Sequence, residues 1–199
     1  MSNTVTAVHK FGGTSLAGAA EFRRVIGILE ASGAQPLAVI VSAPAGFTDA
    51  LHALVHSAET GGDWPFGLES LISRCDGLAE ALLSGAALAE WRAALARDRD
   101  DMHDVLKATA LIGRAPPEVD ALIAGHGEIW SARLLSAALA ARGLAADWFD
   151  ARDALTVIPS ELGPTVAWDQ TRVRFAAAWT PPPAIRVVTG YIARDAHGG

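Results

Sequence analysis

The stretch at residues 9–15 constrains the fold of this chain more than any other. It reads HKFGGTS, follows an apolar run at residues 5–8 and precedes a pattern with helical spacing. A strand, two glycines and a helix start, in this order, let backbone N–H groups approach anionic oxygens, while the helix N-terminus adds positive potential. Lys10 adds a mobile positive charge. The stretch therefore predicts a phosphate-holding loop between a strand and a helix, but not a Walker loop, because the lysine precedes the glycines.

A second strand-to-helix unit follows the first. The first strand is expected over residues 4–11, and residues 36–41 form a continuous apolar run that is typical of another buried strand. Residues 42–49 (SAPAGFTD) then make a loop of mostly small residues before the next helical pattern. Strands that alternate with helices predict right-handed βαβ connections and a parallel sheet. Both loops would lie at the carboxyl ends of adjacent strands, where open α/β sheets bind ligands.

The middle of the chain has a helical pattern throughout. Three apolar stripes with helical spacing follow one another over residues 66–142 with no strand between them, and the third runs from Pro116 to about Gly143. We interpret this stretch as a helical subdomain inserted into the α/β layer. Beyond it, residues 148–150 predict a third strand and residues 185–192 predict the last one.

Composition narrows the classes of function. The chain has 199 residues, 51% of them hydrophobic, which is enough for one sizeable core. Its net charge is −6 and its 16 basic residues are scattered, so no nucleic-acid partner is expected. The single Cys75 excludes an internal disulfide and fits a reducing compartment. The sequence has no signal-peptide pattern and no apolar run of about 20 residues, so we expect a cytoplasmic protein without membrane contact.

Two residues beside the loops have both a functional and a structural interpretation. Lys10 could neutralise a transferring phosphoryl group, or it could be a strand-end lysine that reaches water. The glycines and hydroxyls that follow it favour the functional role. Thr48 precedes a helical pattern and is followed by Asp49, so it is a natural N-cap. A capping threonine could also bind a substrate carboxylate, because both partners face the helix N-terminus.

Residues 125–128 (GHGE) place two glycines inside a strong helical pattern. Each glycine costs a helix about 1 kcal/mol relative to alanine, so close approach of the backbone to a ligand or to the sheet is the expected compensation. Glu128 beside them could hold an ammonium group, or it could be a solvated helix residue. His126 shares an apolar face with Ile123 and Trp130 and is expected to be packed.

Other reactive residue types predict no site. Asp147 and Asp150 are three residues apart, so a strand would place them on opposite faces rather than as an acid pair. Cys75 lies in a regular helical stripe and is expected in the core. No His/Cys spacing suggests zinc, and we predict no metal held by the protein's own side chains.

Four stretches of the chain resemble the aspartate kinases of the amino acid kinase family. Residues 10–15 (KFGGTS) are similar to the N-terminal signature, and residues 41–49 to the second loop, where a threonine contacts the amino acid. Residues 125–132 resemble the Gly-Glu segment, whose glutamate contacts substrate, and residues 188–192 resemble the Gly-Phe strand end. The helical stretch is most similar to that of the bifunctional aspartokinase–homoserine dehydrogenases. The resemblance covers essentially the whole chain.

The resemblance implies a specific fold and activity. The fold would be a three-layer α/β/α arrangement with a mainly parallel sheet and a helical insertion, incomplete at its C-terminal end. The reaction would transfer a phosphoryl group from ATP, with Mg²⁺ held through the ATP phosphates, to the side-chain carboxylate of L-aspartate. The product would be 4-phospho-L-aspartate, in the first step of lysine, threonine and methionine biosynthesis. Such a reaction needs positioning and charge neutralisation rather than a protein nucleophile.

The resemblance also implies roles for individual residues. Lys10 would be catalytic and would contact the ATP phosphates together with the glycines and hydroxyls of the first loop, which are Gly12, Gly13, Thr14 and Ser15. L-aspartate would be held by residues from three other segments, which are Ser42, Thr48, Glu128 and Tyr191.

One departure from the family pattern limits the expected activity. In the family, the last strand seen here is followed by a Gly-Arg-Gly-Gly-Ser-Asp type of loop and by the half that holds the nucleotide, and this sequence has neither. Residues 1–199 would then be the substrate-side lobe of the kinase domain, and efficient turnover by the chain alone is not expected. The alternative is a non-catalytic amino-acid-binding or assembly module derived from that lobe. An exposed sheet edge would favour a homo-oligomer.

Overall fold

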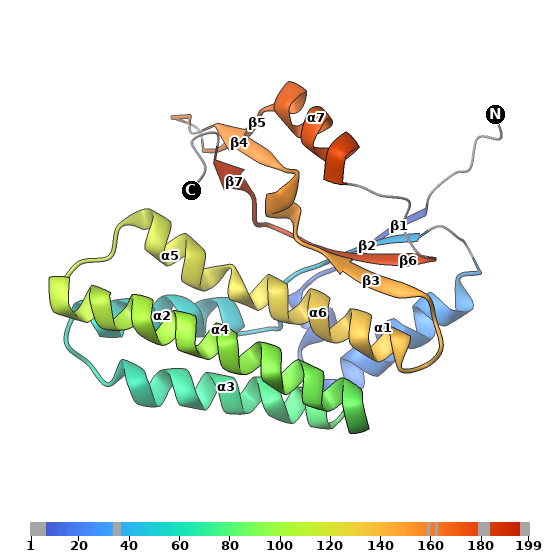
Figure 1. Ribbon diagram of the computed structural model, residues 1–199, viewed down its shortest axis with the longest axis horizontal. Coiled ribbons are helices and arrows are strands. Elements are labelled where there is room, and N and C mark those ends of the chain that lie inside the picture. Colours follow the sequence, from blue (N-terminus) through green and yellow to red (C-terminus); the bar gives the residue numbers. More distant parts are fainter. Residues whose placement is uncertain (1–6, 34–36, 159, 162, 179–183, 196–199) are drawn as a thin grey trace.

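The centre of the protein is a parallel sheet of four strands (Figure 1). The computed structural model describes residues 7–33, 37–158, 160–161, 163–178 and 184–195. The strands lie side by side in the order β1-β2-β6-β3, with the bounds β1 Ala7–Phe11, β2 Leu37–Val41, β6 Ile185–Thr189 and β3 Ala146–Phe149. All neighbouring pairs are parallel. The sheet therefore brings the carboxyl ends of all four strands to one edge.

The burial of each strand follows its place in this sheet. β2 (LAVIV) and β6 (IRVVT) are central, and their near-continuous apolar sequences are largely buried on both faces. β1 has one neighbour among the described strands, and its residues alternate between half-buried and exposed. Lys10 is one of the exposed residues of β1, beside Ile40 of β2.

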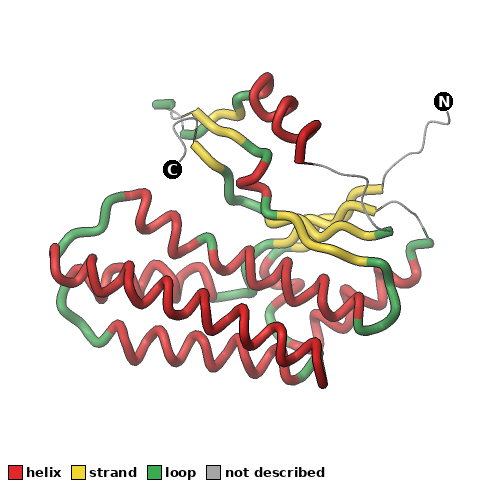
Figure 2. Tube along the Cα trace, viewed as in Figure 1, coloured by secondary structure: helices red, strands yellow, loops and turns green. Residues whose placement is uncertain are grey.

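Helices cover both faces of the sheet, as the resemblance implies (Figures 1 and 2). Their bounds are α1 Ala19–Ala31, α2 Phe47–Glu59, α3 Trp64–Glu80, α4 Gly85–Ile112, α5 Pro117–Ala124, α6 His126–Ala140 and α7 Trp168–Ala178, with short 3₁₀ turns η1 Gly13–Leu16 and η2 Ala151–Asp153. Figure 1 shows α1 to α6 on one side of the sheet and α7 on the other. The α/β/α fold class is therefore confirmed.

One large apolar core joins the sheet to the helices beneath it. α1 contributes residues at helical spacing to this core, among them Phe22, Ile26 and Leu29. The core continues through α6 into α3 and α4, where Leu106 is fully buried. On the opposite face, Phe175 of α7 stacks on Phe149 of β3 with ring centroids 5.9 Å apart. A smaller apolar cluster therefore anchors α7 to the sheet.

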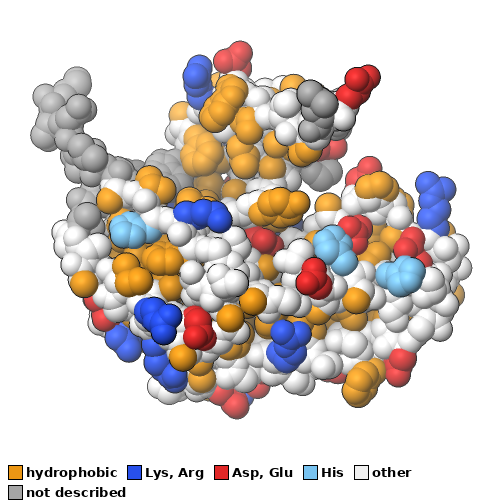
Figure 3. Space-filling model, turned by 180° about the vertical axis from the view of Figure 1, so that it is seen from behind, with side chains coloured by type: hydrophobic (Ala, Val, Ile, Leu, Met, Phe, Trp, Pro, Cys, Tyr) orange, Lys and Arg blue, Asp and Glu red, His pale blue; other side chains and the backbone are white. Residues whose placement is uncertain are grey.

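A small second sheet lies beyond the carboxyl edge of the first. Its strands run in the order β5-β4-β7, with the bounds β4 Thr156–Ile158, β5 Thr165–Val166 and β7 Arg194–Asp195. β4 pairs with β5 in antiparallel and with β7 in parallel. From the side opposite to Figure 1, the surface is hollowed between this unit and the helical body (Figure 3).

The structure corrects several expectations about the elements. The third helical stripe forms two helices, α5 and α6, which meet at Gly125. The last strand ends at Thr189 rather than at residue 192, because the backbone turns at Gly190 and Tyr191. The small sheet was not predicted, since strands of two or three residues are too short to show a period of two. The expected strand residues 4–6 and 36 lie outside the described part of the chain.

Candidate functional site

Three loops are tied together at the carboxyl edge of the parallel sheet: the first loop after β1, the second after β2, and the third after β6, whose Gly190 N–H donates to the Val41 carbonyl at 2.7 Å. Ser42 donates its backbone N–H to the carbonyl of Phe11 at 3.2 Å, which joins the loop after β2 to the end of β1. Ala45 donates to the carbonyl of Gly13 at 3.1 Å, so the same two loops are joined again further out. The loops predicted to meet at this edge therefore do meet there.

Three glycines allow these segments to touch. A Cβ atom on Gly13 would lie 2.7 Å from the carbonyl oxygen of Ala43, and one on Gly190 would lie 2.7 Å from that of Val41. On α6, a Cβ on Gly127 would lie 2.5 Å from the Cβ of Ala43. All three positions converge on residues 41–43. The Gly-Glu segment therefore does approach another segment closely, but the neighbour is the second loop rather than the sheet.

Glu128 of α6 is in direct contact with this second loop. It belongs to the first turn of α6, is only 5% exposed, and accepts a hydrogen bond from the Ala43 N–H at Oε1 over 3.2 Å. Burial raises the pKa of the Glu128 carboxyl above its usual range, and the Ala43 N–H partly opposes that shift. A buried carboxylate of this kind gains stability when a cation approaches it. The interpretation of Glu128 as a solvated helix residue is wrong.

Lys10 and Gly12 leave open space at the start of the first loop. Gly12 has an ordinary extended conformation with φ −80°, so its backbone does not require glycine. A Cβ there would meet only the Nζ of Lys10, at 4.0 Å. Neither strain nor packing within the described chain accounts for Gly12, whereas Gly13 is required by its contact with Ala43. The space beside Gly12 and the Lys10 ammonium is consistent with a bound anion.

The helix start beside this loop differs from the expectation. Residues Gly13–Leu16 form the 3₁₀ turn η1, closed by a bond from the Ser15 N–H to the Gly12 carbonyl at 2.9 Å. The α-helix itself begins at Ala19. The predicted contribution of an α-helix N-terminus next to the two glycines is therefore wrong, and the N–H groups of a tighter turn take that place. Thr14 is exposed within η1 and Ser15 is half-buried.

The remaining candidate residues lie around the second and third loops. The N-cap of α2 is Gly46, in the left-handed region with φ +76°, and Thr48 is the second residue of the helix. Thr48 is therefore not the N-cap, and it is half-buried in the first turn of α2. Ser42 is half-buried directly before Ala43. Tyr191 follows Gly190 and is exposed.

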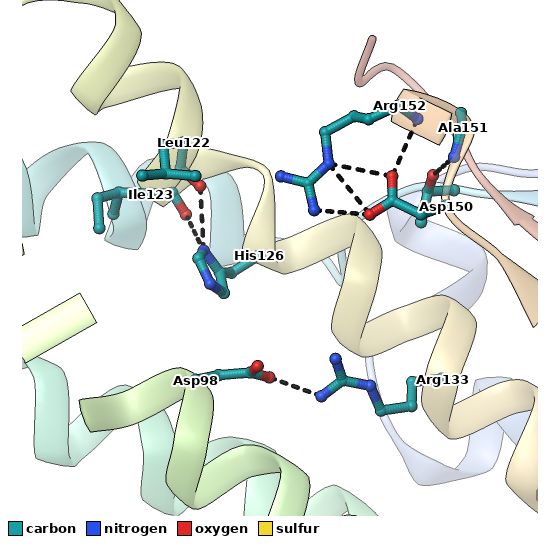
Figure 4. Close-up of polar contacts among 9 residues, drawn as sticks. Asp98, Leu122, Ile123, His126, Arg133, Asp150, Ala151 and Arg152 are labelled. Carbon is teal, nitrogen blue, oxygen red and sulfur yellow. Dashed lines mark hydrogen bonds and ion pairs between the residues drawn. The ribbon is translucent and has the colours of Figure 1, made fainter. Parts of the chain in front are cut away.

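Ionic and packing contacts account for several other polar residues near this edge (Figure 4). Asp150 forms an ion pair with Arg152 at 2.6 Å. Asp147 instead pairs with Arg186 on the neighbouring strand at 2.5 Å, so each of the two carboxylates has an arginine partner of its own. The Ala151 N–H donates to the Thr189 hydroxyl at 2.8 Å. Sequence reasoning missed these contacts, because the partners of Asp147 and Ala151 lie almost 40 residues away.

His126 and Cys75 are packed residues, as expected. The His126 Nδ1 lies 3.0 Å from the Leu122 carbonyl oxygen (Figure 4). Its ring packs against that of Trp130 with centroids 5.7 Å apart. Burial lowers the pKa of the His126 imidazole. Cys75 is buried in the core, and burial raises the pKa of its thiol. Packing within the protein therefore accounts for both residues.

No group of three or more His, Cys, Asp or Glu residues is arranged to hold a metal ion within the described ranges. None of the helices built from those ranges combines the length and the apolar character required to cross a bilayer.

Comparison with known proteins agrees with this geometry. The model of the amino acid kinase family matches residues 5–199. The bifunctional aspartokinase/homoserine dehydrogenase 1 of Arabidopsis thaliana is 31% identical over 193 residues, which are 94% of this chain and 21% of that protein. The bifunctional aspartokinase/homoserine dehydrogenase 2 of Escherichia coli is 34% identical over 151 residues, which are 74% of this chain and 18% of that protein.

Solved structures share the fold. Escherichia coli aspartokinase III in complex with lysine and aspartate superposes with a TM-score of 0.83 at 24% identity, over 97% of this chain and 42% of that one. Clostridium acetobutylicum aspartate kinase gives 0.72 at 19% identity, over 96% of this chain and 40% of that one. The chain thus spans about a fifth of the curated relatives and about two fifths of these structures. Because the family model matches nearly every residue, the chain belongs to the amino acid kinase family.

Proposed function

We propose that the chain is the substrate-side lobe, residues 1–199, of an aspartate kinase, with a helical subdomain at about residues 66–142. The reaction would be ATP + L-aspartate → ADP + 4-phospho-L-aspartate, at the start of lysine, threonine and methionine biosynthesis. Family membership and the relatives named as aspartokinases support this proposal. One of the similar structures is aspartokinase III in complex with aspartate and ADP.

The contact between Glu128 and the second loop is the observation that carries the proposal. It places the buried Glu128 carboxylate, whose Oε1 accepts the Ala43 N–H, beside the loop that leads into α2 and Thr48. In the proposal, Glu128 binds the ammonium group of L-aspartate, and the Thr48 hydroxyl binds a carboxylate. Ser42 and Tyr191 contribute from the loops after β2 and β6. Because the site is built from fixed backbone contacts, it would orient the amino acid without rearrangement.

The first loop would receive the phosphoryl group. ATP is the phosphoryl donor, and its phosphates carry the Mg²⁺ in this proposal. Lys10 would neutralise charge on the transferring group, because its ammonium is exposed beside the open space at Gly12. Gly13, Thr14 and Ser15 would contribute N–H groups and hydroxyls from η1. A cytoplasmic location and a homo-oligomeric state remain predictions from the sequence.

A direct assay tests the proposal. The purified chain is mixed with L-aspartate, MgATP and hydroxylamine, and aspartyl hydroxamate is measured. Signal that disappears in Lys10→Ala but persists in Lys107→Ala supports the kinase. Lys107 is the matched control, since it is the other lysine of the sequence and is exposed on α4.

The assay also separates the kinase from a binding module. If no hydroxamate forms, yet the chain binds L-aspartate and Glu128→Gln weakens that binding, the isolated lobe acts as an amino-acid-binding module and does not carry out the reaction alone. If the chain neither turns over nor binds L-aspartate, the proposal is wrong.

A further inference from the structure

Asp98 is a charged residue at a core position of α4. It continues the helical spacing of three buried residues of the same helix, which are Trp91, Leu95 and Met102. The Asp98 side chain is only 16% exposed, whereas the other acids of the charged run at residues 97–104 are exposed. A carboxylate at such a position costs free energy unless it is paired. The partners of Asp98 therefore decide what it does.

Both partners of Asp98 lie on α6. Its Oδ2 accepts the Trp130 indole N–H at 2.9 Å and a guanidinium N–H of Arg133 at 2.6 Å. Figure 4 shows the carboxylate reaching from α4 toward Arg133. The Arg133 guanidinium also lies over the ring of Trp148 on β3, 5.2 Å from its centroid. Asp98 thus ties α4 to α6, and Arg133 ties α6 to the sheet.

These contacts lie on the opposite side of α6 from the second loop. Trp130 follows Glu128 by two residues, which is about 200° around the helix. On one side, Glu128 accepts the Ala43 N–H, and Gly127 lies against the same residue. On the other side, Asp98 holds Trp130. No side chain caps the N-terminus of α6, so its first turn, which carries Glu128, is held by contacts with its neighbours.

Stability alone is a weak reason for the pairing of Asp98 with Arg133. Replacement of a buried ion pair by apolar side chains of similar volume often leaves a protein equally stable or more stable. Buried polar groups instead fix one packing among several, because each donor must meet its acceptor. An apolar residue at position 98 would allow α6 to rotate or slide, whereas Asp98 requires two donors at fixed places.

We infer that Asp98 is a positioning residue for Glu128: by holding Trp130 and Arg133, it sets the rotation of α6 that places the Glu128 carboxylate beside the second loop. The inference rests on the proposed function for the ligand, which is the ammonium group of L-aspartate. Asp98 acts through α6 rather than on the ligand. A binding group that is oriented in advance loses less freedom when the ligand arrives.

A matched pair of substitutions tests the effect on the ligand. Asp98→Asn removes the charge with almost no change in shape. Asp76→Asn is the control, because Asp76 pairs with Arg92 at 2.7 Å and joins α3 to α4 rather than α4 to α6. The readout is the ratio of the affinities for L-aspartate and for succinate, which lacks the ammonium group. In calorimetric titrations, we expect Asp98→Asn to reduce this ratio about 3–10-fold and Asp76→Asn to leave it unchanged.

Amide hydrogen exchange of Ala43 reports the position of Glu128 without any ligand. The Ala43 N–H donates to Glu128, so it exchanges slowly while that carboxylate stays in place. The amide of Val39, in the centre of β2, corrects for a global loss of stability. Relative to Val39, we expect Ala43 to exchange about tenfold faster in Asp98→Asn than in the unaltered chain, with no change in Asp76→Asn.

Arg133→Gln approaches the same contact from α6. It removes the positive partner of Asp98, so we expect it to change the affinity ratio and the Ala43 exchange in the same direction as Asp98→Asn. Because the two residues act as a pair, the effects should not add in the double variant. Melting curves establish that each variant is folded before it is measured.

The outcomes separate this inference from the proposed function. Faster exchange at Ala43 together with a reduced ratio supports the inference. If the unaltered chain prefers L-aspartate but either readout is unchanged in Asp98→Asn, Asp98 only stabilises the fold and the inference is wrong. If the unaltered chain shows no preference for L-aspartate, the proposed function fails. Faster exchange at Ala43 would then still show that Asp98 positions Glu128, whereas unchanged exchange would overturn both.

Discussion

Glycine has different roles at the carboxyl edge of the parallel sheet, the loop edge, and among helices α3 and α4, the helical layer. At the carboxyl edge of the sheet, a Cβ on Gly13, Gly127 or Gly190 would lie 2.5–2.7 Å from an atom of residues 41–43. In the last turn of α3, a Cβ on Gly77 would meet no atom within 4 Å. The candidate site is therefore shaped by backbone segments that touch, whereas the helical layer is held by buried side chains. The two regions should respond differently to added and to removed atoms.

Removal of a buried side chain should have the largest effect, and only on stability. Leu106 of α4 is fully buried in the main core. Leu106→Ala should lower the free energy of unfolding by about 2–5 kcal/mol, because transfer energy is lost and a cavity remains. The measurement is urea denaturation, with the exposed neighbour Lys107→Ala as the control. L-aspartate affinity should be unchanged, and its loss in a folded variant would show that the two regions are not separate.

Addition of one methyl group at the loop edge should have the next largest effect. In Gly127→Ala the new Cβ would overlap that of Ala43 and displace the hydrogen bond to Glu128. Overpacking of this kind costs about 1–3 kcal/mol, part of which is offset by better helix propensity. We expect reduced stability in urea together with loss of L-aspartate binding. A variant that binds normally would mean that the contact between α6 and the second loop does not shape the site.

The same substitution in the helical layer should stabilise the protein. Gly77 is exposed inside α3, so alanine has room there and favours the helix. Gly77→Ala should raise the free energy of unfolding by up to about 1 kcal/mol. Urea curves of Gly77→Ala and Gly127→Ala, recorded together, compare one chemical change in the two regions. The contrast between the regions fails if both curves shift in the same direction.

The smallest stability effect should come from Glu128, and it should depend on pH. Its pKa in the folded protein is raised, so the carboxyl favours folding below the unfolded value of about 4.3, and this contribution is lost as pH rises through the folded pKa. Glu128→Gln does not titrate and can still accept the Ala43 N–H. We expect the variant to gain stability over the unaltered chain as pH rises from 4 to 8. A difference in melting temperature that stays constant over this range would contradict the burial of an ionised carboxyl.

Periodicity was enough to predict the elements of the α/β layer. The apolar runs before the two loops and the helical stripes after them correspond to β1, β2, α1 and α2. The helix cost of two nearby glycines also identified the Gly-Glu segment as a place of close approach. The strands, the helices and the helix cost of the glycines depend on neighbours within a few residues, which a sequence pattern can reveal.

Contacts between distant segments were beyond the sequence pattern. Glu128 and Ala43 are 85 residues apart, so burial of the carboxylate could not be predicted from helical spacing. Thr48 was expected to cap α2, but the left-handed Gly46 starts the helix two residues earlier. The division of α5 from α6 falls at Gly125, where a Cβ would lie 3.4 Å from a methyl group of Ile192, a residue from a distant segment. The burial of Glu128 thus depends on a contact between distant segments, whereas the start of α2 depends on the left-handed conformation of Gly46.

Calorimetric titration with L-aspartate and with succinate tests the central claim most directly. Succinate has the two carboxylates of aspartate but no ammonium group, so it probes what Glu128 contributes. We expect the unaltered chain and Glu90→Gln, an exposed control on α4, to bind L-aspartate at least about tenfold more tightly than succinate. Glu128→Gln should abolish that preference. If the unaltered chain binds both ligands equally, or if Glu128→Gln keeps the preference, Glu128 does not hold the ammonium group and the proposed site is wrong.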